Sequence, residues 1–284
     1  MKDTPLSSSR QQHDSKKEGE DREAEDRAAP DGVIIYKAIL SEGKSELDRA
    51  SSALFWSGLA AGLSMGFSLI AESALRGALP DAPWRPLVSK LGYSIGFLIV
   101  ILGRQQLFTE NTLTPILPLL QKPESKTFFN VLRLWGLVLL ANMLGAFAVA
   151  WVLARTPALT AETHQAMTDI GREAMSHGFA THFLRAIFAG WLIALMVWLL
   201  PYAESARVLV IILLTYVIGL GHFSHVIAGS VVTFAYAAAG HASWPHVFGG
   251  FFVPALLGNV LGGLTLVTAL NHAQVVAGTS DQDL

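Results

Sequence analysis

Two histidines, His222 and His225, lie in the sequence GHFSH inside a long apolar stretch of the chain. Between Arg207 and Asp281 there is no Lys, Arg, Asp or Glu. The ordinary pKa of histidine is about 6.5, so an imidazole here can hold or release a proton near neutral pH. An ionisable side chain in such surroundings usually faces a protein interior or a cavity. His225 is therefore a candidate pore residue, and a structural histidine bonded to a backbone carbonyl is the alternative.

The two histidines form an H-x-x-H pattern, which raises the question of a metal site. Zinc needs further ligands, and the chain has no cysteine and no carboxylate in this stretch. We therefore predict no metal and no cofactor, and we expect His222 to lie in a loop or vestibule. The lack of cysteine also excludes disulfide scaffolds and cysteine catalysis.

A second candidate group is the sequence RQQLFTEN. Leu107 and Phe108 are predicted to act as apolar plugs that narrow a path. Thr109 is suited to cap the N-terminus of a following half-helix, and its hydroxyl is a candidate to face a solute or His225. Capping and packing alone are the alternative role for this segment.

Two charged residues flank this segment. Glu110 falls in the first turn of the predicted half-helix, where a carboxylate suits the helix dipole, and we favour that structural role. Arg104 stands where the preceding half-helix is expected to end. We expect it to pair with Glu110, and capping of carbonyl groups or attraction of anions are the alternatives.

The composition places these residues in a membrane protein. Charged residues make up 15% of the chain and hydrophobic residues 52%, against about 25% charged residues in ordinary soluble domains. The small net charge of −2, without a basic stripe, argues against a nucleic-acid partner. Uncharged runs that approach or exceed the roughly 20 residues of a membrane-spanning helix stand at 50–71, 134–154, 186–203, 208–239 and 247–270.

Two crossings are interrupted. Residues 91–103 and 112–121 are each too short to span alone, so we predict that they form one second crossing with a break between them. The fifth crossing breaks at GHFSH. Backbone that lacks partners at membrane depth is tolerated only where protein buries it or a cavity solvates it, so the breaks indicate an interior cavity or pore. Half-helices whose N-termini point toward its centre would favour anions.

An internal repeat relates the two breaks. The sequences LLANMLGAF and LLGNVLGGL align Asn142 with Asn259, an offset of 259 − 142 = 117, which also aligns 107–109 with 224–226. Both asparagines are expected to bond backbone that the breaks leave free. Each half has three crossings, an odd number, so the halves must be inverted. We predict an all-α membrane protein of six transmembrane helices in two inverted repeats with broken second and fifth helices, a pattern that points to a transport site.

The other segments follow from charge and polarity. Residues 1–32 are polar and highly charged, so we predict a disordered cytoplasmic tail. Residues 33–49 are predicted to form an amphipathic helix at the membrane surface. A channel domain follows at 50–272, with halves at about 50–155 and 179–272, and residues 273–284 form a short C-terminal tail. A small excess of Lys and Arg favours cytoplasmic N- and C-termini.

At the breaks, the sequence resembles the formate/nitrite transporter family. RQQLFTENTL is similar to its first-loop signature, FSHVIAGS to its F-x-H-x-x-A motif, and FAGWLIALMVW and GNVLGG to its fourth- and sixth-span motifs. The likeness covers about residues 42–272 and is closest to an inner-membrane bacterial subgroup. Gly190 stands where the family has an asparagine. Many relatives carry a lysine in the outer vestibule, which this chain lacks after Lys126, and the candidates to replace it are Arg172, His177 and Arg185.

This resemblance implies an aquaporin-like protomer that assembles as a homopentamer in the lipid bilayer of the bacterial inner membrane, with one pore per protomer. It also implies that Leu107, Phe108 and Thr109 form a constriction and that Thr109 hydrogen-bonds His225, which in the family is proposed to donate a proton to the solute. We therefore expect a proton-linked permease or channel for small monovalent anions or their weak acids, such as formate or nitrite, and not an enzyme. The alternatives are a channel for water, ammonia or hydrogen sulfide, and a membrane scaffold that does not transport.

Overall fold

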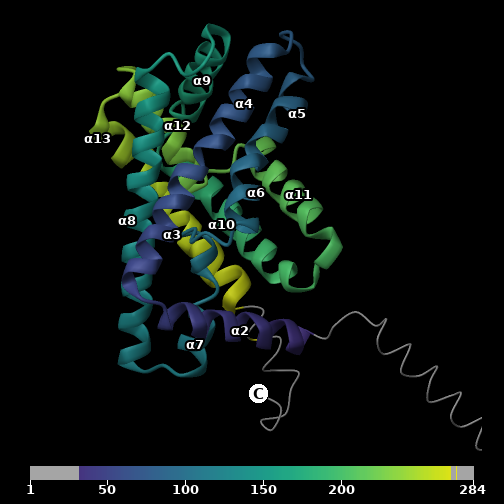
Figure 1. Cartoon of the computed structure of the whole chain (residues 1–284), viewed down its shortest axis with the longest axis vertical. Helices are drawn as coiled ribbons and strands as arrows, with labels where there is room; N and C mark the ends of the chain where they lie inside the picture. Colours follow the sequence, from purple (N-terminus) through teal and green to yellow (C-terminus); the bar gives the residue numbers. More distant parts are fainter. Residues whose placement is uncertain (1–31, 270–272, 274–284) are drawn as a thin grey trace, which may run out of the picture.

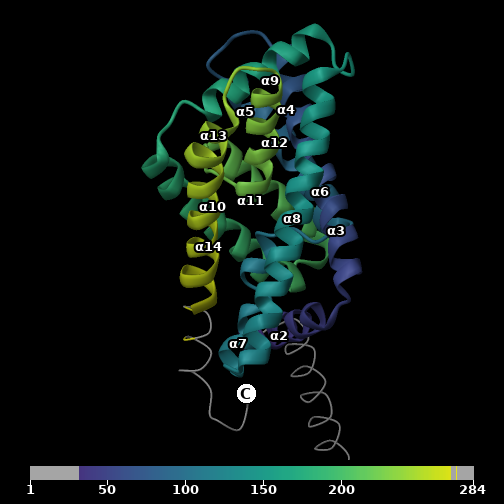
Figure 2. The same ribbon diagram turned by 90° about the vertical axis from the view of Figure 1, so that its left-hand side faces the viewer.

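The computed structural model describes residues 32–269 and 273, and within them every regular element is helical. The predicted disordered tail, apart from its last residue, and nearly all of the predicted C-terminal tail lie outside the described residues. The helices form an elongated bundle with α2 and α7 at one end and α9 at the other (Figures 1 and 2). The longer elements are α2 Gly32–Asp48, α3 Ser51–Ser64, α4 Gly66–Ala78, α6 Ser94–Leu102, α7 Ile116–Gln121, α8 Ser125–Arg155, α9 Ala161–Ala174, α10 Phe179–Leu199, α11 Arg207–Leu220, α12 Val226–Ala238 and α14 Val253–Leu261.

Five helices of the described part are long and apolar enough to cross a membrane. The predicted fifth crossing is present as two shorter helices, α11 and α12, and residues 221–225 connect them. The helix that contains α14 is irregular, since α13 Trp244–His246 and α14 flank a π-helical stretch, η5 Val247–Phe252. The five long helices are Ser51–Ala78, Arg85–Leu102, Ser125–Arg155, Phe179–Tyr202 and Trp244–Thr265.

Several spans extend beyond the uncharged runs that predicted them. The first helix continues past Ala71 through Glu72, and the second begins at Arg85 and includes Lys90. These charges are tolerated because Lys90 Nζ lies 2.5 Å from Glu72 Oε1 in a buried ion pair. The first half of the second crossing is therefore longer than the predicted 91–103, because the helix includes charged residues that the sequence pattern treated as boundaries.

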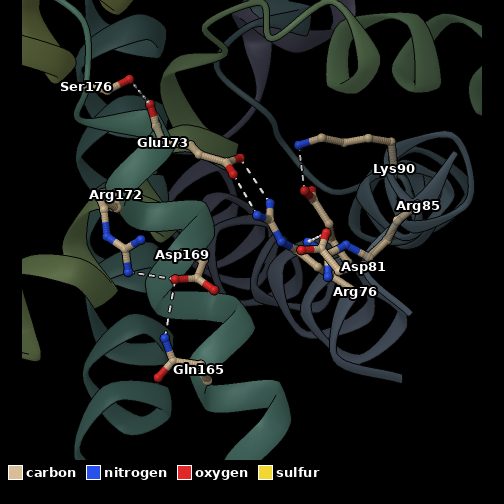
Figure 3. Close-up of polar contacts among 10 residues, drawn as sticks. Arg76, Asp81, Arg85, Lys90, Gln165, Asp169, Arg172, Glu173 and Ser176 are labelled. Atoms are coloured by element: carbon tan, nitrogen blue, oxygen red, sulfur yellow. Dashed lines mark hydrogen bonds and ion pairs between the residues drawn. The ribbon is translucent and has the colours of Figure 1, made fainter. Parts of the chain in front are cut away.

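Two helices lie at the ends of the bundle. The predicted surface helix is present as α2, which buries Tyr36, Ile39 and Leu40 in a small apolar cluster. At the opposite end, α9 was not predicted. It packs on α4, where Arg76 forms an ion pair of 2.6 Å with Glu173 (Figure 3). The two ends of the bundle are therefore each covered by a helix outside the long apolar spans.

Each half contains an equivalent close contact between two helices. The helix α3 packs on α8, and α10 packs on α14. A Cβ at Gly62 would collide with the carbonyl of Asn142, and a Cβ at Gly190 would collide with the carbonyl of Asn259. Glycine at both positions therefore lets each asparagine-bearing helix approach its partner closely, as small residues do in membrane helix interfaces. Gly190 accordingly serves helix packing here.

Candidate functional site

The half-helices before the two breaks end in the same way. The residue after each helix end adopts a left-handed backbone conformation, Arg104 with φ of 50° and His222 with φ of 51°. The next backbone N–H, of Gln105 or Phe223, bonds a carbonyl five residues back at 2.9 and 3.0 Å respectively. This is the hydrogen bond of a Schellman helix end, and it turns the chain out of the helix at equivalent points in both halves.

Asn142 of α8 holds the first break. Its Oδ1 accepts a hydrogen bond from the backbone N–H of Phe108 at 2.9 Å. Its Nδ2 donates to the carbonyl of Gln106 at 2.9 Å and to that of Gly58 in α3 at 2.7 Å. One fully buried amide thus replaces backbone partners that the interrupted helix lacks.

Asn259 of α14 holds the second break with the same three kinds of bond. Its Oδ1 accepts from the N–H of Val226 at 2.8 Å, and its Nδ2 donates to the carbonyls of Ser224 and Ala186, both at 2.8 Å. The predicted backbone role of both asparagines agrees with these bonds. The bonds also correct the register of the repeat, because they match 106–108 with 224–226, an offset of 224 − 106 = 118, rather than the predicted 107–109.

A hydrogen bond joins the two breaks through side chains. His225 Nε2 lies 2.8 Å from Thr109 Oγ1, and both residues are buried. The other ring nitrogen, Nδ1, accepts from the backbone N–H of Ala228 at 3.2 Å and so caps α12. A neutral imidazole with an accepting Nδ1 carries its hydrogen on Nε2, so His225 donates to the Thr109 hydroxyl. The alternative of a bond to a backbone carbonyl is not what the structure shows.

Thr109 does not cap a helix through its side chain. No side-chain cap bond is present at Thr109, and the predicted half-helix is reduced to a short turn, η2 Glu110–Thr112, followed by α7. Pro115 precedes α7, and a residue before proline is disfavoured from helical geometry. Only α12 therefore presents a substantial half-helix N-terminus at a break, and the predicted pair of N-termini is incomplete.

Buried apolar side chains lie close to this hydrogen bond. Leu107 and Phe108 are 0% and 2% exposed, and neither lines either of the two cavities described below. The Phe97 ring lies edge-on to the His225 ring, with centroids 5.0 Å apart. The Phe97 ring thus packs against the imidazole of His225, which also lines the cavity described next.

A cavity of about 370 Å³, here called the α9-side cavity, reaches His225 from the end of the bundle that carries α9. Its wall brings together four histidines: His177, His182, His222 and His225. It therefore contains His177 and His222, which the sequence singled out, and also His182, which it did not. No group of three or more metal-ligating side chains is present in residues 32–269 and 273.

Four charged side chains also line the α9-side cavity: Glu72, Lys90, Glu173 and Arg185. Glu72 is paired with Lys90 and Glu173 with Arg76 (Figure 3). Arg185 has no ion-pair partner within the described part of the chain. The resemblance made Arg185 a candidate for this cavity but overlooked Lys90, which precedes the second span rather than following Lys126.

A larger cavity of about 780 Å³, the α2-side cavity, lies toward the opposite end of the bundle. Arg104 and Glu110 both line it, but no ion pair joins them among the described residues. The expected pairing is therefore wrong. Glu110 Oε1 is buried and has no hydrogen-bond partner in the described structure.

Glu46 connects α2 to the first break. Its carboxylate accepts hydrogen bonds from Thr114 Oγ1 at 2.5 Å and from Gln106 Nε2 at 3.0 Å. Gln106 in turn accepts from Asn111 through its Oε1 at 2.9 Å. Burial raises the pKa of the Glu46 carboxyl above its ordinary value, and the two donated hydrogen bonds oppose that rise. This role could not be predicted from the sequence, because Glu46 lies among other charged residues on an amphipathic helix.

The comparisons with known proteins agree with this architecture. The inner membrane protein YfdC of Escherichia coli K12 is 42% identical over 251 residues, which cover 88% of this chain and 81% of that protein. The formate channel BtFdhC of Bacillus thuringiensis is 28% identical over 243 residues, which cover 82% of this chain and 91% of that protein.

Solved structures share the fold. A pentameric formate channel with formate bound matches with a TM-score of 0.67 at 19% identity, over 80% of this chain and 98% of that one. An FNT family ion channel matches with a TM-score of 0.73 at 20% identity, over 87% and 99% respectively. The sequence profile described as formate/nitrite transporter matches residues 33–273. This chain belongs to the formate/nitrite transporter family, and it is a multi-pass membrane transport protein rather than an enzyme.

Proposed function

We propose that this protein is a channel or permease for small monovalent anions or their weak acids, of the size of formate or nitrite. The solute would pass between the α9-side and α2-side cavities through the region beside Thr109 and His225. The single observation that carries the proposal is the 2.8 Å hydrogen bond between these two side chains, because it joins the two breaks at the inner end of a cavity. Leu107 and Phe108 would form the constriction.

The proposal includes the predicted membrane architecture and assembly. Six crossings, with the second and fifth broken in inverted halves, are supported by the matching asparagine bonds at the two breaks. Large apolar side chains such as Trp56, Phe129 and Leu184 are well exposed, which suits contact with lipid or with neighbouring protomers. A homopentamer in the bacterial inner membrane, with cytoplasmic termini, is proposed from the similarity to a pentameric formate channel and to the inner membrane protein YfdC, and from the charge distribution.

The hydrogen-bond geometry defines what proton linkage requires. In its neutral form His225 donates from Nε2 to Thr109, and the Thr109 O–H has no other acceptor among the described residues. That hydroxyl is therefore available to a passing anion. A proton taken up by the ring would occupy Nδ1 and replace the bond from Ala228. Proton transfer to the solute through the Thr109 hydroxyl would remove the Nε2 hydrogen and leave a neutral ring that carries its hydrogen on Nδ1. The bond from Ala228 would return once that hydrogen had left Nδ1 and a hydrogen again occupied Nε2.

The test is uptake of labelled formate, nitrite and acetate into proteoliposomes under an imposed pH gradient. We expect His225→Asn to change at least one flux or its pH dependence, because asparagine retains the capping ability of the residue but cannot titrate. His225→Ala and Thr109→Val remove the cap and the hydroxyl respectively. His246→Asn, an exposed histidine outside both cavities, is the matched control. Wild-type fluxes in both His225 variants would exclude the proton-linked role.

A second candidate function is a channel for a neutral solute such as water, ammonia or hydrogen sulfide. The pairing of Lys90 with Glu72 favours it, because this pair adds no net charge to the α9-side cavity. Liposome swelling in a stopped-flow instrument distinguishes the two functions. Permeation of a neutral solute that is indifferent to pH, without anion uptake, would select this second candidate.

A further inference from the structure

His182 lies beside the proposed path and has a free ring nitrogen. It occupies the first turn of α10, is 3% exposed and lies on the wall of the α9-side cavity together with His225. Its Nδ1 is 3.0 Å from Ser224 Oγ, and the Phe251 ring packs edge-on at 5.0 Å between centroids. Its Nε2 is buried and has no hydrogen-bond partner in the described structure. The contacts with Ser224 and Phe251 thus hold the imidazole in place and leave its Nε2 without a partner.

An unused buried nitrogen is costly, since a polar atom removed from water without a partner loses its hydrogen bonds to water without compensation. The cavity supplies the space in which a partner would lie. The neighbouring charge is favourable for an anion, because Arg185 follows three residues later in α10, lines the same cavity and has no ion pair in the described part of the chain. Residues three apart on a helix share one face.

We propose that His182 is a solute-binding residue whose Nε2 donates a hydrogen bond to an oxygen of a small carboxylate or nitrite-like anion in the α9-side cavity. The inference rests on the proposed transport function and adds a binding site ahead of the Thr109–His225 pair. In the tautomer in which Ser224 Oγ donates to Nδ1, the neutral ring carries its hydrogen on Nε2 and can donate it to the anion. Arg185 contributes the net positive charge that holds the anion.

The first measurement is the concentration dependence of formate and nitrite uptake by the full chain in liposomes. His182→Met removes the donor, and we expect the half-saturation concentration to rise about tenfold, the effect of one charge-assisted hydrogen bond. The maximal rate should stay within about twofold of the wild-type rate. The reason is that a contact which stabilises the bound solute and the passing solute equally changes the half-saturation concentration and not the maximal rate. His182→Gln can place an amide N–H near the position of Nε2 and should recover most of the affinity. His246→Gln is the control.

The second measurement is titration calorimetry of sodium formate and sodium nitrite with the purified protein in detergent. Binding should persist in His225→Asn and weaken about tenfold in His182→Met, provided that both variants keep the wild-type unfolding midpoint. Because binding is measured without transport, a failure of the His225 flux test leaves this result interpretable. Unchanged affinity in His182→Met, a loss of maximal rate with unchanged half-saturation, or no binding of either anion to the wild type would overturn the proposal.

Discussion

The two breaks share a backbone scaffold but differ in their side chains. In both, a left-handed residue ends the first half-helix and one buried asparagine binds three backbone groups. The first break carries two buried apolar side chains and a hydroxyl, whereas the second carries the histidine and a full half-helix, α12. The repeat therefore positions the chain, and the differences between the halves provide the chemistry. The predictions that follow test this division, from the largest expected effect to the smallest.

The first prediction concerns the buried ion pair, which belongs to the first half alone. Lys90→Met should lower the free energy of unfolding by about 3–5 kcal/mol, because it leaves the Glu72 carboxylate buried without a cation. Adding Glu72→Leu should recover most of that loss. Unfolding titrations in SDS measure both, and Lys44→Met on the exposed face of α2 is the control. Equal stability of the single and double variants would contradict the pairing as the reason why charge is tolerated in this span.

The second prediction compares the asparagines. Asn142→Ala and Asn259→Ala should each lower the free energy of unfolding by about 3 kcal/mol, since each leaves three buried backbone groups without a partner. The same SDS titration applies, with Asn130→Ala on α8 as the control. A large loss of unfolding free energy in one variant and none in the other would contradict the prediction, because the two asparagines would then not stabilise their breaks equally.

The third prediction concerns the close helix contacts. Gly62→Ala and Gly190→Ala should each cost about 1–3 kcal/mol, the usual effect of overpacking, because the added methyl meets the backbone of an asparagine in both cases. Gly136→Ala, whose Cβ would meet no atom within 4 Å, should be neutral or slightly stabilising. Thermal unfolding in detergent gives the ranking. A Gly190 variant that changes solute affinity at unchanged stability would instead place this residue in the path.

The fourth and smallest effect is expected at the helix ends. Arg104→Gly and His222→Gly should each raise the free energy of unfolding by about 0.5–1 kcal/mol, because glycine adopts the left-handed conformation without strain. Gly240→Ala, at φ of 91°, should have the opposite sign. Differential scanning calorimetry of the three variants measures this, and destabilisation by both glycine substitutions would show that the Arg104 and His222 side chains contribute more than the strain costs.

The sequence predicted the parts of the fold that leave a pattern in hydrophobicity. The apolar runs located the spans, and the polar interruptions RQQLFTEN and GHFSH located both breaks. The alignment of Asn142 with Asn259 related the two breaks, with a register that was wrong by one residue. The sequence did not reveal Glu72, Lys90 or His182, because a charged or polar residue near a span end is indistinguishable from a boundary until its partner is known.

The short α7 was missed for a related reason. An uncharged run predicts burial but does not fix helix length, and Pro115 interrupts the helix there. The Thr109–His225 bond was expected from the family resemblance rather than from spacing, since the two residues are far apart in the sequence.

The constriction that we propose for Leu107 and Phe108 has a consequence for the rate of permeation. A barrier of close-packed hydrocarbon excludes hydrated ions more strongly than it excludes small, weakly solvated molecules, because a charge loses its water before it gains compensating contacts. The rate of permeation would then depend on how often thermal fluctuations separate these two side chains and on the free energy that each permeant needs to lose its hydration shell. Selectivity among permeants of equal size should therefore follow their dehydration free energies.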